Sequence, residues 1–316
     1  MAGFSTQANE HLIRSNLWSN RLKEAFEGDL IGMKYVDWIT DFPDGDTINI
    51  PSIGQMETND YVEGQAVKYT AMDEGNFTFS ITDYKSSATY ITDKHKQDSF
   101  YADRLVSRFV PKMERAIKVG MEEAVLAIGP DGQTASDLNA INGGNHRFVG
   151  GGTNEVIELA DFARAKYALQ KAEVPMTNLV AIVDPSVEFE LKTLTNLTAL
   201  DSNPRWEGVV RDDLSTGMRF LTNVYGFDVY VSHYLKSGIS ETINSVTAAS
   251  GVANLFFSAA PDALPFVGNI RQAPKVDSEY NKDMQREEYV TTCRYGFKLY
   301  RPENLVTVIT DTDQVA

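Results

Sequence analysis

Residues 98–128 carry the longest regular pattern in this sequence. Apolar side chains recur there at a step of four residues, with one step of three, and they are Tyr101, Leu105, Phe109, Met113, Ile117, Met121, Val125 and Ile128. This spacing places all of them on one stripe of an α-helix. At 1.5 Å per residue, the helix is a rod about 45 Å long. Gly129-Pro130 is expected to end it, and Pro111 to kink it or remove one backbone hydrogen bond. A rod of this length is suited to a structural, load-carrying role within the subunit.

Two segments before this helix cannot be stable alone. Residues 1–34 form a polar arm whose one short helix presents only a few apolar side chains, namely Leu17, Trp18, Leu22, Ala25 and Phe26. Residues 50–92 alternate apolar and polar side chains, as in Val67 and Tyr69 and again in Phe77 and Phe79, with a turn expected at 73–76. Because an isolated hairpin is marginally stable in water, we expect this extended hairpin to lie on another domain or another chain.

The remainder of the chain mixes helices with strands. A glycine-rich connection over 131–152, expected to be flexible, leads to a helix at 156–173, a strand at 179–183 and a second helix beginning at Pro185. Short strands are expected at 227–231 and 255–257. Residues 289–300 return to period two, and 305–309 should pair back on them after a turn at 301–304. The fold class is therefore α+β, with a central α/β part flanked by a helix-and-sheet part.

Composition sets the limits of function. The 316 residues carry a formal net charge of −15, which argues against a surface that neutralises phosphate groups. The single cysteine, Cys293, excludes an intramolecular disulfide and is expected to be a small buried side chain. No apolar stretch is long enough to span a bilayer and no signal peptide is evident, so a soluble protein made in a cytosol is expected.

No catalytic, cofactor or metal site is predicted. The acidic pairs, such as Glu122-Glu123, are adjacent and should be solvated surface residues. The four histidines are scattered without metal-ligand spacing and are expected on the surface or in loops: His11, His95, His146 and His233. Nucleophile and phosphate-binding motifs are absent. Carboxylates distant in sequence could still converge, which leaves a carboxylate-dependent hydrolase as an alternative.

The order of these segments resembles the major capsid proteins of tailed bacteriophages with the HK97-like fold. Short phrases along the chain are similar to those of the family in the same order: LWS at 17–19, DGDTINIP at 44–51, IVDP at 182–185, GFDVYVS at 226–232 and YGFKLYRPE at 295–303. The resemblance covers nearly the whole chain. A compartment shell protein of the encapsulin type shares the fold class and stays an alternative.

The resemblance implies a division of the chain. Residues 1–34 are the N-terminal arm, and 35–149 the peripheral domain with its extended loop (50–92) and spine helix (98–128). Residues 150–274 are the central domain, and 275–316 the strands that return to the peripheral domain.

The resemblance also implies assembly into hexamers and pentamers of an icosahedral head that encloses DNA without sequence-specific binding. Scaffolding, portal and decoration proteins would be separate partners, no membrane is involved, and assembly would take place in the host cytoplasm. The expected intersubunit contacts come from the arm and the loop, and are Leu17, Trp18, Leu22, Phe26, Val67, Tyr69, Phe77 and Phe79.

Overall fold

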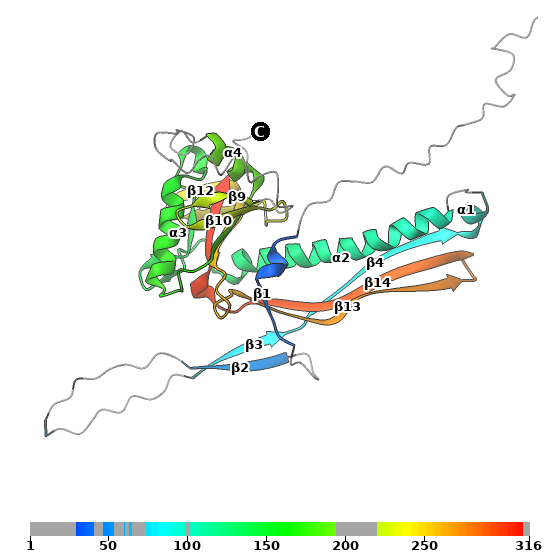
Figure 1. Ribbon diagram of the computed structural model, residues 1–316, viewed down its shortest axis with the longest axis horizontal. Coiled ribbons are helices and arrows are strands. Elements are labelled where there is room, and N and C mark those ends of the chain that lie inside the picture. The colour runs from blue at the N-terminus through cyan, green and yellow to red at the C-terminus, as the bar shows by residue number, and fades with distance from the viewer. Residues whose placement is uncertain are drawn as a thin grey trace, which may run out of the picture.

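A compact body and an elongated helix-and-sheet extension share one long helix (Figure 1). The computed structural model describes residues 30–40, 47–53, 60, 63–64, 74–98, 102–193 and 220–311. The extension holds a four-stranded sheet, and the body holds a seven-stranded sheet covered by two shorter helices. The mixed α and β content agrees with the fold class that the sequence predicts.

The long helix, α2 (Ala102–Gly132), lies on one face of the four-stranded sheet. That sheet has the order β1 (Val36–Trp38), β13 (Phe266–Asn281), β14 (Arg286–Leu299) and β4 (Asp83–Thr92). Ile117 and Met121 of the helix pack on Cys293 and Tyr295 of β14. Cys293 is fully buried, as the alternation along 289–299 predicts.

The helix begins and ends later than its sequence pattern indicates. Residues 93–98 form a separate short helix, α1 (Asp93–Asp98), and α2 continues through Gly129 and Pro130 to Gly132. The expected stop at Gly129 is therefore wrong. A Cβ atom on Gly129 would lie 2.8 Å from Leu255 Cδ2, so this glycine permits close packing against the body.

The seven-stranded sheet forms the centre of the body. Its order is β7 (Arg147–Val149), β15 (Val306–Asp311), β12 (Val246–Ser258), β8 (Leu179–Val183), β10 (Phe227–Val231) and β9 (Phe220–Val224), with β11 (Ile239–Ile243) paired to β12. Helices α3 (Leu159–Lys171) and α4 (Pro185–Thr193) cover one face through a shared apolar core. Val125 and Leu126 of α2 pack in the core on the other face. The long helix thus contacts both sheets.

The last strand corrects one prediction. Residues 305–309 were expected to pair back on 289–300, but β15 pairs antiparallel with β12 and parallel with β7 in the body. All six of its residues are buried, and such a strand needs a sheet that is covered on both faces. A 3₁₀ turn, η3 (Pro302–Asn304), carries the chain from β14 to this position. The C-terminal strands therefore divide between the two sheets.

The extended hairpin is shorter than the alternating pattern indicates. Strands β2 (Thr47–Ile53) and β3 (Glu74–Ser80) pair with each other, so residues 74–76 are part of a strand and not of the expected turn. Residues 83–92, which were expected to continue the hairpin, form β4 and pair with β14 over all ten residues. A period of two identifies a strand but not the strand it pairs with. The alternation alone therefore could not separate β3, which pairs with β2, from β4, which pairs with β14.

The glycine-rich connection is ordered and not flexible. It contains β5 (Ala140–Ile141), β6 (Gly144–Asn145) and β7, followed by the 3₁₀ turn η2 (Thr153–Glu155). A Cβ atom on Gly150 would lie 2.7 Å from the carbonyl oxygens of Glu155 and Val156. Glycine is needed there because two backbone segments come into contact. A glycine that permits close packing and a glycine that makes the chain flexible look the same in a sequence.

Candidate functional site

The base of the β2–β3 hairpin is fixed against the end of β14. The ring of Phe77 meets that of Tyr300 edge to face, with centroids 5.0 Å apart. Lys298 Nζ donates a hydrogen bond to the carbonyl oxygen of Thr78 at 2.6 Å and lies 4.8 Å from the Phe77 ring centroid. These contacts fix the direction in which the hairpin leaves the molecule (Figure 1).

The structure revises the list of predicted contact residues. Phe79 has 0% of its surface exposed and packs on Ile81 and Val267 of its own chain, so it has no surface left to offer a neighbouring subunit. Phe77 is half-buried at the hairpin base. The other six lie outside the described residues: Leu17, Trp18, Leu22, Phe26, Val67 and Tyr69.

The segment that leads out of the arm is held by a buried carboxylate on α2. The 3₁₀ turn η1 (Gly32–Tyr35) begins beside Glu122, whose side chain is 0% exposed. The expectation that Glu122 is a solvated residue is wrong. Its carboxylate accepts the backbone N–H groups of Ile31, Gly32 and Met33 at 2.7, 2.6 and 3.0 Å. These hydrogen bonds replace the water that the carboxylate loses on burial.

A buried ion pair joins the C-terminal end of α2 to the body. Arg147 donates to both carboxylate oxygens of Glu241, from Nη2 at 2.6 Å and from Nε at 3.1 Å. Its Nη1 donates to the carbonyl oxygen of Pro130 in the last turn of α2, at 2.8 Å. Burial tends to raise the pKa of Glu241, but the hydrogen bonds from Arg147 and from the Ser136 backbone hold it below its usual value. One side chain therefore links α2, β7 and β11.

His146 lies in the bend between β6 and β7, a loop position as the sequence predicts, but it is a core residue and not a surface one. It is fully buried, with Nδ1 at 3.0 Å from the carbonyl oxygen of Gly144 and Nε2 at 3.1 Å from that of Glu303. Burial lowers the pKa of its ring, although the two carbonyl oxygens act in the opposite direction. Its nitrogens face backbone groups, so the residue is structural. His95 and His233 are exposed, and His11 lies outside the described residues.

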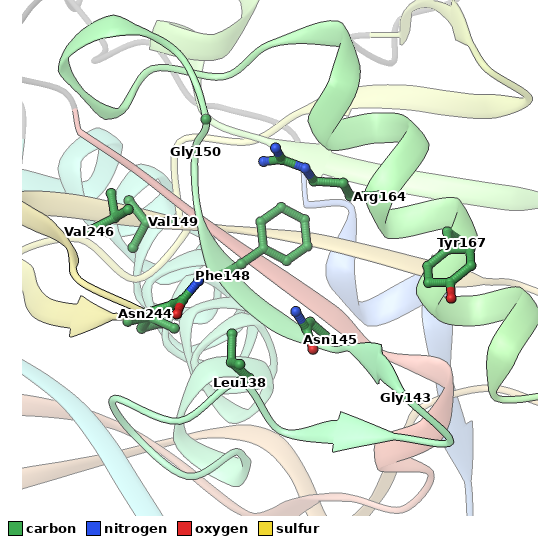
Figure 2. A pocket seen from close by; sticks show the side chains of 12 residues that line it. Leu138, Gly143, Asn145, Phe148, Val149, Gly150, Arg164, Tyr167, Asn244 and Val246 are labelled. Carbon is green, nitrogen blue, oxygen red and sulfur yellow. The ribbon is translucent and has the colours of Figure 1, made fainter.

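A hollow of about 490 Å³ opens in the body between α3, the β6–β7 segment and the turn between β11 and β12 (Figure 2). Apolar side chains and glycines form much of its lining, with Phe148 near its middle. Its ionisable side chains are those of Arg164 and Tyr167, and Arg164 is paired with Asp161 at 3.0 Å. The lining offers no carboxylate and no pairing of a nucleophile with a base.

Among the residues that the structure describes, no group of three His, Cys, Asp or Glu side chains is placed to hold a metal ion.

None of the described helices is both long enough and apolar enough to cross a bilayer.

No direct signal in the sequence marks Glu122 or Arg147 as a buried residue that joins two elements. For Glu122 a weak signal exists, because it lies one helical turn before Leu126 and beside the apolar stripe. If the apolar stripe extends sideways to include Leu126, the carboxylate of Glu122 lies under it and is buried. For Arg147 no local signal exists, since its partner Glu241 lies 94 residues away.

Comparison with known proteins agrees with this architecture. A family model described as phage capsid protein matches residues 76–308. A capsid structure of cyanophage Pam1 is similar with a TM-score of 0.72 at 14% identity, over 98% of this chain and 99% of that one. A chain from Mycobacterium phage Che8 is similar with a TM-score of 0.69 at 17% identity, over 92% and 95% of the two chains.

A third similar structure is the capsid of cyanophage P-SCSP1u, with a TM-score of 0.68 at 15% identity over 98% of this chain and 96% of that one. No curated protein matched the sequence. Because the family model spans more than half of the 316 residues, the chain belongs to the phage capsid protein family. It has the HK97-like fold, and it is a structural protein of the virion: a major capsid protein that self-assembles into the hexamers and pentamers of the head.

Proposed function

We propose that the β2–β3 hairpin and the N-terminal arm connect neighbouring subunits of the shell. The observation that carries this is the position of the hairpin, which is fixed at its base by Lys298 and Tyr300 while β2 and β3 pair only with each other in the described part of the chain. The base of the hairpin packs on its own chain, but a two-stranded ribbon that extends beyond this contact needs a further surface to be stable in water. In a shell, a neighbouring subunit supplies that surface.

The contacts of α2 with both sheets support different positions for the body and the extension within the capsomer. Its C-terminal half packs on the body through Val125 and Leu126, and its middle packs on the extension through Ile117 and Met121. We assign the body, mainly residues 150–274, to the centre of each capsomer and the extension to its periphery. The helix stiffens the connection between the body and the extension, because it contributes side chains to the cores of both.

The shell has no enzymatic role in this proposal. It encloses DNA without sequence-specific binding, which agrees with the formal net charge of −15, and it assembles in the host cytoplasm. Scaffolding, portal and decoration proteins are separate chains. A compartment shell with an enzyme cargo is the second candidate, and the contents of purified particles separate the two: nuclease-protected DNA supports a phage head.

The hairpin is tested by replacing residues 54–73 with an Asn-Gly turn, which keeps β2 and β3 paired. We expect a soluble chain with the melting temperature of the wild type that forms no closed shells in negative-stain images. A matched control replaces residues 194–219, which lie between α4 and β9 in the sequence, with a linker of similar length and should still assemble. Closed shells of normal diameter from the shortened hairpin would refute the proposal.

A further inference from the structure

The four-stranded sheet has two outer edges of different character. The edge formed by β13 beyond Gly268 carries Pro274, two register shifts and the charged residues Arg271, Lys275, Asp277 and Glu279. Proline, irregular register and charge are the devices that prevent an edge strand from pairing with another chain. That edge is protected.

The opposite edge, β4, has no proline and no register shift, and its charged residues, Asp83 and Lys85, lie at its start. It pairs with β14 in one regular register from Asp83 to Thr92, and no other described strand adjoins it. Between Lys85 and Asp93 it carries no charge, no proline and no glycine. An edge strand with a long, regular and uncharged stretch is a template for pairing with a further strand.

The side chains of β4 divide into two faces. Ser87 lies opposite Thr291 and Lys85 opposite Cys293. Thr291 and Cys293 are fully buried, and Cys293 packs on α2, so the odd-numbered residues of β4 share the helix-covered face. Tyr84 and Tyr90 belong to the uncovered face and are 61% and 57% exposed. They are among the most exposed large apolar side chains in the described part of the chain.

The spacing of the two tyrosines makes this edge self-complementary. Each lies three residues from Ser87, so two antiparallel β4 strands related by a two-fold axis at Ser87 place Tyr84 opposite Tyr90 of the other copy. Directly opposite residues share a face, and aromatic pairs at such positions stabilise a sheet. In the same register Ser86 meets Ala88, and Lys85 meets Thr89, so no like charges oppose each other.

We infer that β4 pairs antiparallel with β4 of a second copy of this chain, joining two four-stranded sheets into one of eight strands in the assembled shell. The inference rests on the self-assembly of the chain and adds a specific contact that the hairpin does not provide. An interface of one surface with itself is two-fold symmetric, whereas a hairpin that binds a different surface gives a head-to-tail contact that closes rings. The β4 contact therefore suits a link between one capsomer and the next.

A cysteine at the proposed axis tests the register directly. In Ser87→Cys, the two new thiols would face each other across the axis, with Cα atoms about 4.5 to 5.5 Å apart, within the range of a disulfide. Ser86→Cys is the matched control, because its two copies would be diagonal neighbours about 7–8 Å apart. Ser86 is the more exposed of the two, so random collisions would favour the control.

Shells of both variants are oxidised mildly and run on a non-reducing gel. We expect most Ser87→Cys chains to migrate as dimers, at least tenfold more than Ser86→Cys chains. Equal cross-linking of the two, or shells of Ser87→Cys without dimers, would overturn the inference. Failure of the wild-type chain to form shells would instead contradict the assembly on which the inference rests.

If Ser87→Cys chains do not assemble, a charge on the edge gives a second test. Ala88→Glu on β4 should lower the yield of shells at least tenfold while leaving the melting temperature of the soluble chain unchanged. Ser278→Glu, at an exposed position on the protected edge strand β13, should leave the yield unchanged. Normal shells from a folded Ala88→Glu chain would overturn the inference.

Discussion

The carboxylate of Glu122 accepts the backbone N–H of Gly32 at 2.6 Å, and this contact joins the middle of α2 to the segment that leads out of the N-terminal arm. A Cβ atom on Gly32 would lie 2.9 Å from Leu126 Cδ2, so the backbone approaches the helix closely enough for three N–H groups to reach one side chain. The position where the arm joins the rest of the subunit is thus set by one buried carboxylate and one glycine.

Removing that charge should loosen the arm. Glu122→Gln keeps one acceptor oxygen but loses the charge and the second oxygen, so at least one buried N–H becomes unsatisfied. We expect a loss of about 1–3 kcal/mol in the free energy of unfolding and faster hydrogen exchange at residues 31–33. The exposed neighbour provides the control: Glu123→Gln should change stability by less than about 0.5 kcal/mol. Equal effects of the two variants would show that the contact does not stabilise the fold.

The buried pair of Arg147 and Glu241 predicts a dependence on pH. Glu241→Gln leaves the guanidinium buried without a counter-charge and should cost about 3 kcal/mol at pH 7. The folded pKa of Glu241 is depressed, so its contribution is fully present above the unfolded pKa of about 4.3 and is lost as the pH falls through the folded value.

The difference in melting temperature between wild type and Glu241→Gln should therefore be constant from pH 7 to about pH 5, and should shrink below about pH 4.3. A difference that shrinks already between pH 7 and pH 5 would contradict this assignment.

Gly296 fixes the distance between β14 and the end of β3 at the hairpin base. A Cβ atom there would lie 2.8 Å from the carbonyl oxygen of Ser80 and 2.9 Å from Ile81 Cα, both backbone atoms. Gly296→Ala should therefore push the hairpin base away and destabilise the chain by about 1–3 kcal/mol. At Gly120 in α2 no described atom lies within 4 Å of the added Cβ, so Gly120→Ala should stabilise the helix by about 1 kcal/mol. Chemical denaturation measures both, and opposite signs are expected.

Cys293 should be unreactive in the folded chain. Burial raises the pKa of its thiol, so the thiolate that reacts with alkylating agents is scarce at pH 8, and the side chain is 0% exposed. Iodoacetamide should label it only after unfolding. Rapid labelling of native shells would show that α2 separates from β14 in the assembled state.

Local patterns were enough to predict several elements. The apolar stripe defined α2 from Met113 to Val125, and the apolar run at 179–183 defined β8, which is buried throughout. Pro185 marked the start of α4 because its fixed φ suits the first turn of a helix. These features depend on neighbours within one or two turns, which a sequence displays directly.

The tertiary structure decided what depends on distant partners. The sequence predicted a strand at 305–309 and period-two chain through residue 92, but only the fold shows that β4 joins β14 and that β15 lies between β7 and β12. Only the fold shows that Glu122 and Arg147 lie in the interior. Their hydrogen-bond partners lie about 90 residues away in the chain, so no local pattern predicts the burial. Strand pairing and the burial of charge are set by three-dimensional contacts, and no local period in the sequence encodes them.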